Sequence, residues 1–373
     1  MDPYRPAPPQ AAAPRRRSFG IMIPTLILVI IAAGWSAFWF YAADRAQQTI
    51  AGWFAREQQA GRIYRCETQG LGGFPFRIEY RCGGASAELQ NLKPPVALTA
   101  TRMLAAAQVY QPNLILAEID GPMSIADPGQ SPNLTANWSL AQVSLRGTPR
   151  APQRVAVAAD RVTVDHNGTG QMAQVFAARR AELHGRLASG TVTENPVIDI
   201  AGNLVQATMP MLHPLAAQAF DLSADTRLVG LRNFQPKPWA ARFREIQQAD
   251  GRIEVRNARV KQGDLLAIAN GTLKLTASGH LDGDLQVTAT GVEKILPALG
   301  VEVLARSGSR NERLGAALSF LDKMAPGAVA SAVSLLGEPA ELEGRKATRM
   351  PLRFRNGVAT LGPVKLAQTP PLF

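Results

Sequence analysis

Residues 271–291 read GTLKLTASGHLDGDLQVTATG, and apolar residues alternate with polar ones on both sides of the Asp-Gly pair. A period of two residues is the pattern of a half-buried β-strand, so the stretch predicts a β-hairpin. A three-residue loop over residues 282–284 would pair Leu281 with Leu285 and keep the apolar residues on one face. We therefore expect that register, with the small residues Ala277 and Gly279 letting another element approach closely.

The same alternation recurs along most of the chain, with Gly, Asn or Asp at the breaks. It is clearest in residues 154–164, 197–207, 252–260 and 265–277. Short connections between such strands favour antiparallel pairing. The sequence therefore predicts a mainly β (α+β) protein with one large antiparallel sheet, curved or folded over.

A few helices should interrupt this sheet. Pro238 begins the stretch PWAARFREIQQADG, and Gly251 is placed to end a helix there. A second apolar stripe at helical spacing covers residues 312–324 and is typical of core packing. No domain boundary is evident, although the Pro-rich residues 93–96 and 235–238 are candidate hinges.

A membrane anchor is predicted ahead of the sheet. Residues 21–43 contain no charged side chain and are long enough to cross a hydrocarbon core of about 30 Å as a helix. Trp35, Trp39 and Tyr41 gather near its far end, as an interfacial aromatic belt does. A cleaved signal peptide is the alternative, but the apolar run is longer than usual and no clear small-residue cleavage site follows it.

Three arginines set the expected orientation: Arg15, Arg16 and Arg17 directly precede the apolar run. The positive-inside rule then places the N-terminus in the cytoplasm and the body on the non-cytoplasmic side of the membrane. The expected parts are a disordered basic tail (1–20), the transmembrane anchor (21–43), a juxtamembrane helix (44–61) and a β-rich domain on the non-cytoplasmic side (62–373).

The formal net charge of +11 does not indicate a nucleic-acid partner. Beyond the N-terminal arginines the basic residues are scattered among acidic ones, whereas a nucleic-acid footprint clusters on one face and brings stacking aromatics. A basic surface near anionic lipid headgroups fits the pattern better.

Cys66 and Cys82 are the two cysteines of the chain. An even, closely spaced pair outside the cytoplasm is more often a disulfide than anything else. A metal site would need further ligands, and a redox pair would need the closer C-x-x-C spacing. We expect a disulfide that stabilises the fold.

Between the cysteines lies the motif Gly73, Phe74, Pro75, Phe76 and Arg77. A flexible glycine, a proline of fixed φ and two aromatic rings predict a turn that enters a strand. Either the motif is a well-packed strand start, or it is a contact site for a partner or a lipid.

These elements carry a family resemblance. An anchor helix, GFPFR inside a cysteine pair, many short strands and PLRFRNGVATLGPVKLAQTPPL at residues 351–372 resemble an uncharacterised bacterial envelope family, domain of unknown function 2125 (DUF2125). The strand style is more distantly similar to AsmA-like envelope proteins, whose curved sheets are associated with lipid handling. The resemblance implies an envelope location and a β-rich fold, and it implies no agreed activity.

Motifs for chemistry are absent from the sequence. There is no phosphate-binding G-x-x-x-x-G-K-[ST], no G-x-S-x-G elbow and no H-E-x-x-H pair. His166 follows Asp165, and Asp282 lies near Asp284, but such residues are common in turns. We expect no enzyme, no catalytic or metal-binding residue and no cofactor, while a hydrolase built from dispersed residues stays a third possibility.

The expected function follows from the anchor and the alternating strands. It is an inner-membrane-anchored, single-pass periplasmic protein of the cell envelope that binds lipid, or helps to move it, along an apolar groove of the sheet. Its partner would be membrane lipid. The alternative is a non-enzymatic structural or assembly protein that docks onto an envelope protein partner.

Overall fold

The computed structural model describes residues 22–168, 172–212, 214–234, 237–291, 337–362 and 364–373. Two α-helices, α1 (Met22–Gln59) and α2 (Trp239–Gln248), and a short 3-10 helix, η2 (Pro214–Ala217), accompany the strands. The tail over residues 1–20, with Arg15, Arg16 and Arg17, and the helix expected over residues 312–324 lie outside the described residues. The predicted hinge at residues 235–238 is described only in part.

In the described residues, eighteen strands form one antiparallel sheet, which confirms the predicted fold class. The strands are β1 (Arg62–Arg65), β2 (Thr68–Gly72), β3 (Arg77–Leu89), β4 (Val96–Gln108), β5 (Gln111–Ala126), β6 (Leu134–Asn137), β7 (Leu140–Thr148), β8 (Ala151–Asn167), β9 (Met172–Thr191), β10 (Glu194–Ala207), β11 (Phe220–Val229), β12 (Arg252–Gln262), β13 (Leu265–Leu275), β14 (Leu281–Thr290), β15 (Glu338–Leu342), β16 (Arg345–Arg355), β17 (Val358–Leu361) and β18 (Val364–Gln368).

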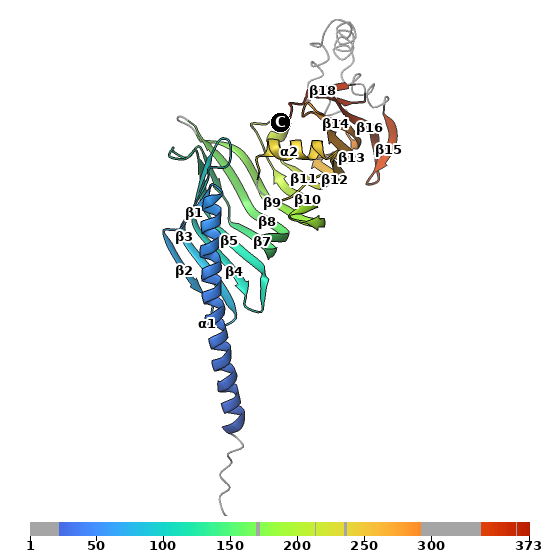
Figure 1. The fold of residues 1–373 in the computed structure, drawn as a ribbon. Helices are drawn as coiled ribbons and strands as arrows, with labels where there is room; N and C mark the ends of the chain where they lie inside the picture. The colour runs from blue at the N-terminus through green and yellow to red at the C-terminus, as the bar shows by residue number, and fades with distance from the viewer. Residues whose placement is uncertain (1–21, 169–171, 213, 235–236, 292–336, 363) are drawn as a thin grey trace, which may run out of the picture.

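The sheet is a meander in which most strands pair with the next strand along the chain. From β7 to β14 this pairing is continuous, and β14 then pairs with β16. In one place two short strands, β6 and β7, follow each other end to end, and both pair with β5 on one side and β8 on the other. Figure 1 shows the sheet turning as it runs from the N-terminal strands beside α1 to the C-terminal strands beside α2.

A line of irregular positions crosses the sheet and accounts for part of this curvature. Gly84 in β3 has a φ of 59°, and the register shifts opposite it between Ala100 and Arg102 of β4. Further along the sheet, Arg161 in β8 has a φ of 51°, and the register of β8 with β9 shifts nearby, between Val164 and Asp165. Each bulge adds an unpaired residue and increases the local twist, so bulges aligned across successive strands bend the sheet as a whole.

The C-terminal half of α1, which covers most of the predicted juxtamembrane helix, packs on the sheet. Trp53 stacks on Tyr64 of β1 with ring centroids 5.0 Å apart, and Phe54 meets Tyr80 of β3 edge-on at 6.1 Å. The N-terminal half of α1 extends beyond the sheet (Figure 1). The predicted anchor and juxtamembrane helix are thus one continuous helix, and Gly61, with a φ of 74°, follows its end.

The helix predicted after Pro238 is confirmed as α2, and it covers the other end of the sheet. Ile246 of α2 is buried against Ile198, Leu231 and Leu275, and together they form a buried hydrophobic cluster. The side chains of Phe243, Leu372 and Phe373 pack around this cluster. The C-terminal residues therefore belong to the core of this half.

The predicted register of the 271–291 hairpin is wrong. Leu275 pairs with Leu281, and the connection is the five residues 276–280 rather than residues 282–284. Any connection with an odd number of residues keeps the apolar residues of the two strands on one face, so the alternation alone does not place the turn. The Asp-Gly pair lies inside β14 because β16 pairs with this strand from the other side, and Arg355 of β16 donates a 2.8 Å hydrogen bond to Asp284.

Gly279 lies in the actual turn, with a φ of 81°. A Cβ at this position would come within 2.8 Å of the carbonyl oxygen of Phe373. The amide of Leu372 donates a 2.9 Å hydrogen bond to the carbonyl of Gly279. The expectation that a small residue here lets another element approach closely is therefore confirmed, and that element is the C-terminal segment.

Candidate functional site

One face of the sheet carries both helices, and we call it the inner face. Residues that are directly paired on neighbouring strands share a face, so the pairing traces this face from α1 towards α2. The row is Tyr80, Ala105, Ala117, Val143, Val157, Leu183 and Gly202. Tyr80 lies under Phe54 of α1, and three strands past Val143 the face reaches the cluster under α2 at Ile198 of β10.

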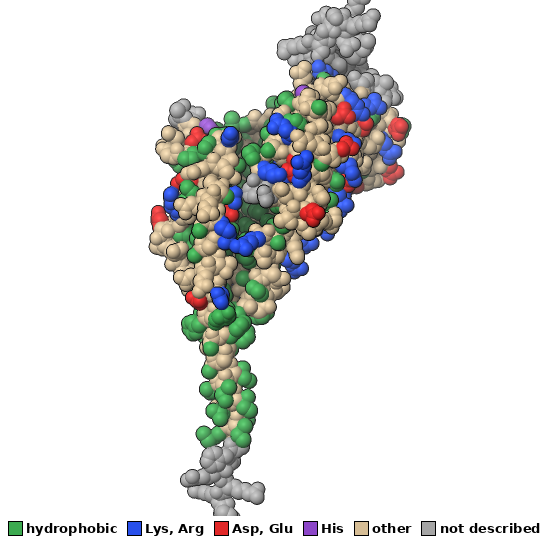
Figure 2. Space-filling view, viewed as in Figure 1, with side chains coloured by type: hydrophobic (Ala, Val, Ile, Leu, Met, Phe, Trp, Pro, Cys, Tyr) green, Lys and Arg blue, Asp and Glu red, His purple; other side chains and the backbone are tan. Residues whose placement is uncertain are grey.

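Between the two helices the inner face is apolar and open to solvent. Val155, Val157 and Leu183 are 36%, 39% and 55% exposed. Figure 2 shows a hollow there, with hydrophobic side chains on its floor. We call this hollow the trough. Its lining in β8 to β11 includes Val155, Val157, Leu183, Ile198, Ile200 and Leu228.

The trough ends at a wall formed by α2 and the segment before it. Phe234 and Trp239 stand there with Lys237 and Arg242, beside a hollow of about 370 Å³. That volume falls within the roughly 300–1,000 Å³ of small-molecule sites. An apolar floor with a few polar groups at one end is the usual make-up of such sites.

The charges of this wall are organised by the buried carboxylate of Glu245. Burial alone would raise its pKa, but hydrogen bonds from Lys237 and from the backbone N–H of Arg232 lower the pKa of Glu245 below its usual range. Arg242 also pairs with Glu245 at 3.4 Å. Lys237 and Arg242 carry two positive charges against the single carboxylate, so these three side chains together have a net charge of +1.

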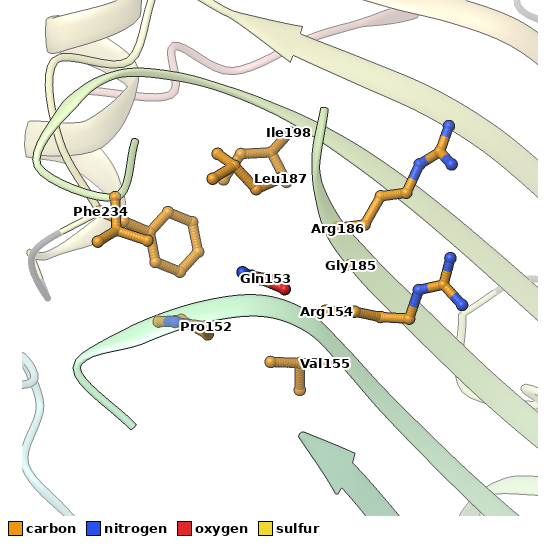
Figure 3. A pocket seen from close by; sticks show the side chains of 10 residues that line it. Pro152, Gln153, Arg154, Val155, Gly185, Arg186, Leu187, Ile198 and Phe234 are labelled. Atoms are coloured by element: carbon orange, nitrogen blue, oxygen red, sulfur yellow. The ribbon is translucent and has the colours of Figure 1, made fainter. Parts of the chain in front are cut away.

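A narrower apolar hollow lies at the strand ends next to Phe234. Figure 3 shows Val155, Leu187 and Phe234 around it, whereas the guanidinium groups of Arg154 and Arg186 point away from Phe234. The two kinds of side chain alternate along β8 and β9, so apolar groups face the trough and charged groups face the opposite side. We call that opposite side the outer face.

The outer face carries a cluster of arginines around Asp199 of β10. Arg227, Arg186 and Arg256 donate hydrogen bonds to this carboxylate at 2.7, 2.9 and 3.0 Å. The Asp199 side chain is only 7% exposed. The hydrogen bond from Arg227, followed by that from Arg186, holds the pKa of Asp199 well below its usual range although burial opposes the shift. The cluster ties β9, β10, β11 and β12 together on the side away from the trough.

The predicted disulfide is confirmed, since Cys66 and Cys82 are joined. Cys82 is buried in β3, and Cys66 lies just before β2. The bond therefore fixes β3 to the segment between β1 and β2.

The motif from Gly73 to Arg77 lies directly against α1, which agrees with the prediction of a well-packed strand start, while a contact site for a partner or a lipid stays a prediction. Trp35 Nε1 donates a 2.8 Å hydrogen bond to the carbonyl of Pro75, and Trp39 Nε1 donates a 2.9 Å bond to the carbonyl of Arg77. Gly73 has a φ of 97°, and a Cβ there would lie 2.6 Å from the carbonyl oxygen of Arg77, so the turn requires glycine. The backbone is packed.

The two phenylalanine rings of the motif are more open. Phe74 stacks on Phe40 with centroids 6.0 Å apart, and Phe76 lies 6.2 Å from the ring of Trp35. Phe74 is nevertheless 52% exposed and Phe76 62% exposed. The motif thus holds a packed backbone and presents apolar surface beside the helix.

Residues that the sequence singled out for chemistry do not assemble into a site. Asp284 and Asp282 pair with Arg355, and His280 Nδ1 lies 3.1 Å from Ser278 Oγ in the β13–β14 turn. Across the described ranges, no group of three or more His, Cys, Asp or Glu side chains is placed to hold a metal ion.

Comparison with protein families agrees with the recognised motifs. The model of uncharacterised proteins conserved in bacteria, DUF2125, matches residues 39–370. The chain belongs to the DUF2125 family. The match spans α2 and the strands from β1 to β18, so the trough, the Asp199 cluster and the GFPFR motif all lie within it. No curated protein matches this DUF2125 chain.

One helix of this DUF2125 protein, α1, is long and apolar enough to cross a membrane, judged over the described residues. Its length and composition fit the predicted single-pass membrane anchor. The side of the membrane on which the sheet lies remains an expectation from Arg15, Arg16 and Arg17.

The sequence pattern indicates strands of the trough, but it does not indicate which residues of different strands meet there. The alternation in residues 154–164 was evident, yet Leu183 and Ile198 come from other strands and share a face with Val157 only through the pairing register. The Asp199 cluster was missed for the same reason, because Arg256 lies 57 residues from Asp199 in sequence.

Proposed function

We propose that this DUF2125 protein is a membrane-anchored protein of the bacterial cell envelope that binds lipid, with acyl chains lying in the trough between α1 and α2. The observation that carries the proposal is the open apolar inner face, on which the Leu183 side chain is 55% exposed. Leaving apolar surface in water costs about 25 cal/mol per Å². Contiguous apolar surface on a folded protein usually marks a binding site.

The position of the trough favours lipid as its occupant. One of its flanks is α1, whose N-terminal half is apolar on all sides and extends beyond the sheet. Because the C-terminal half of α1 packs on the inner face, a lipid leaving the bilayer along that helix would reach that face. The net positive wall at Lys237 and Arg242 would then face the phosphate of a headgroup.

The separation of apolar and charged side chains onto opposite faces supports a specific binding site rather than nonspecific hydrophobic association. Charged side chains occupy the outer face of the same strands, where Asp199 and its arginines are hydrogen-bonded to each other. Exposed valine and leucine are concentrated on the inner face of β8 and β9. The body is expected in the periplasm, since arginines precede the anchor.

The test compares two substitutions on opposite faces of the sheet. Leu183→Asp places a charge in the trough, and Leu116→Asp is the matched control, because Leu116 is 53% exposed but pairs with Ser144 on the outer face. The full-length proteins are purified in a mild detergent, and phospholipid per protein is measured by mass spectrometry after organic extraction. Lipid bound around α1 is the same in all three proteins and cancels.

The wild-type and Leu116→Asp proteins should carry equal lipid, and Leu183→Asp should lose at least one lipid per chain. Equal lipid in all three proteins would rule out the trough as a lipid site. In that event a specific protein crosslinked to the inner face would favour the alternative, a structural or assembly protein that docks onto an envelope partner.

A further inference from the structure

The tip of the sheet next to α1 lies at the level of the apolar half of the helix. Trp35 is nine residues before Asp44, the first charged residue of α1. At 1.5 Å per residue, Trp35 is about 14 Å closer to the membrane than Asp44 along the helix axis. Because Trp35 hydrogen-bonds Pro75, the GFPFR motif is held at that level.

Three exposed aromatic rings share this tip. Phe74 and Phe76 belong to the motif, and Tyr110 forms the turn between β4 and β5. The amide of Val109 donates a 3.0 Å hydrogen bond to the carbonyl of Phe76, which joins the two turns. Tyr110 is 65% exposed, so the joined turns present an aromatic surface beside α1. Figure 2 shows hydrophobic side chains gathered where the body meets the protruding part of the helix.

Four of the five backbone carbonyls of the motif have hydrogen-bond partners, as a loop at a membrane interface requires. The carbonyls of Gly73, Pro75, Phe76 and Arg77 accept hydrogen bonds from Arg77, Trp35, Val109 and Trp39, in that order. Proline has no N–H to satisfy. An irregular loop enters a bilayer only where its polar backbone groups have partners, because lipid offers none.

Charged side chains border the aromatic surface on its polar side. Arg77 and Arg81 flank the buried carboxylate of Glu79 and are themselves largely exposed. Two arginines around one carboxylate leave a net positive charge. Aromatic rings next to arginines are the composition of a surface that rests at the boundary of headgroups and acyl chains.

We propose that the tip formed by residues 73–77 and Tyr110 inserts into the outer boundary of the membrane that α1 spans, as a second membrane contact. The occupant of this surface is the lipid bilayer itself, since the tip is continuous with the apolar helix. The contact sets the sheet at a fixed orientation to the membrane. It does not depend on lipid binding in the trough, which lies on different strands.

The test measures depth in a bilayer with the full-length protein in nanodiscs of phosphatidylethanolamine and phosphatidylglycerol. Single cysteines for a nitroxide label replace Phe76, Tyr110 and, as control, Lys93 in the exposed β3–β4 turn. The control lies at the other end of β3, whose 13 residues span roughly 40 Å. Both native cysteines are joined in the disulfide, so labelling without reductant leaves them unlabelled.

Labels at Phe76→Cys and Tyr110→Cys should lose most of their collisions with a water-soluble nickel complex and gain collisions with oxygen, relative to Lys93→Cys. Two tip positions guard against a local effect of either substitution. If both tip labels collide with nickel as often as the control does, the tip is in water and the proposal is wrong. Such a result would leave the lipid content of the trough unaffected.

Discussion

The indole Nε1 of Trp35 donates a 2.8 Å hydrogen bond to the carbonyl oxygen of Pro75, 40 residues further along the chain. Trp39 repeats the contact one turn later in α1, at the carbonyl of Arg77. The aromatic belt of the apolar helix therefore also positions the body of the protein. Tryptophan does this well because its ring is apolar while its N–H still seeks a partner.

Replacing both indoles by phenyl rings should loosen the motif without removing the helix. In the Trp35→Phe, Trp39→Phe protein each lost hydrogen bond costs about 1 kcal/mol. Backbone amide exchange of Arg77 and Val109, whose N–H groups bond within the joined turns, should become faster. Hydrogen exchange read by mass spectrometry measures this.

The matched control for that experiment is Trp53→Phe, because Trp53 lies nearer the C-terminal end of the same helix and stacks on Tyr64. It should change exchange in β1 and leave residues 73–77 as in the wild type. Unchanged exchange at the motif in the double variant would show that the two indole bonds do not hold it.

Orientation is predicted from the residues around the anchor. A reporter enzyme that is active only outside the cytoplasm should be active when fused after Phe373, because Arg15, Arg16 and Arg17 keep the N-terminus inside. Changing these three arginines to glutamate should reduce that activity. If this fusion is inactive and a second reporter, which works only in the cytosol, is active at the same position, the basis for the periplasmic location is removed.

The disulfide should stabilise the N-terminal strands. Cys66 and Cys82 are 16 residues apart, and closing a loop of that size contributes about 3 kcal/mol on the chain-entropy model. The Cys66→Ser, Cys82→Ser protein should therefore unfold at lower urea concentration. Reductant should shift wild-type unfolding in the same direction and leave the double variant unchanged; an equal response of both proteins would be inconsistent with this role.

Asp199 should make folding sensitive to acid. Its pKa is lowered in the folded protein, so the folded state holds the ionised form while the unfolded carboxyl titrates near its ordinary value of about 3.9. The resulting stability is complete above that ordinary value and is lost as pH falls below it towards the folded pKa. At pH 7, Asp199→Asn should cost about 2–3 kcal/mol, somewhat less than a fully buried pair, because the arginines remain partly exposed.

Asp225→Asn is the control for this substitution. Asp225 lies on the outer face of β11, is about half exposed and meets Arg256 at 3.8 Å. It should cost little at any pH. The stability difference between wild type and Asp199→Asn should shrink below about pH 4; a difference that stays constant down to pH 3 would contradict the ionised cluster.

Local patterns predicted the strand content, α2, the disulfide and the length of α1, because each depends on residues close in sequence. The β13–β14 turn shows where this reasoning fails. The Asp-Gly pair at residues 282–283 is a strong turn signal, yet pairing with β16, some 70 residues later, keeps it inside a strand. Non-local pairing decided the register.

The candidate site was predictable as a kind of surface but not as a set of residues. Alternation in each strand implied an apolar face, whereas the identity of its open part depends on where α1 and α2 lie. The packing of Trp53 on Tyr64 and of Ile246 on Ile198 covers the two ends and leaves Leu183 between them. No single stretch of sequence contains that information.

Photocrosslinking in living cells tests the lipid proposal most directly. A benzophenone amino acid replaces Leu183 in the trough or Leu116 on the outer face, the cells are irradiated, and the purified full-length protein is analysed by mass spectrometry. The account predicts a phospholipid adduct at position 183 and much less at position 116. Equal lipid adducts at both positions, or a protein adduct alone at position 183, would contradict it.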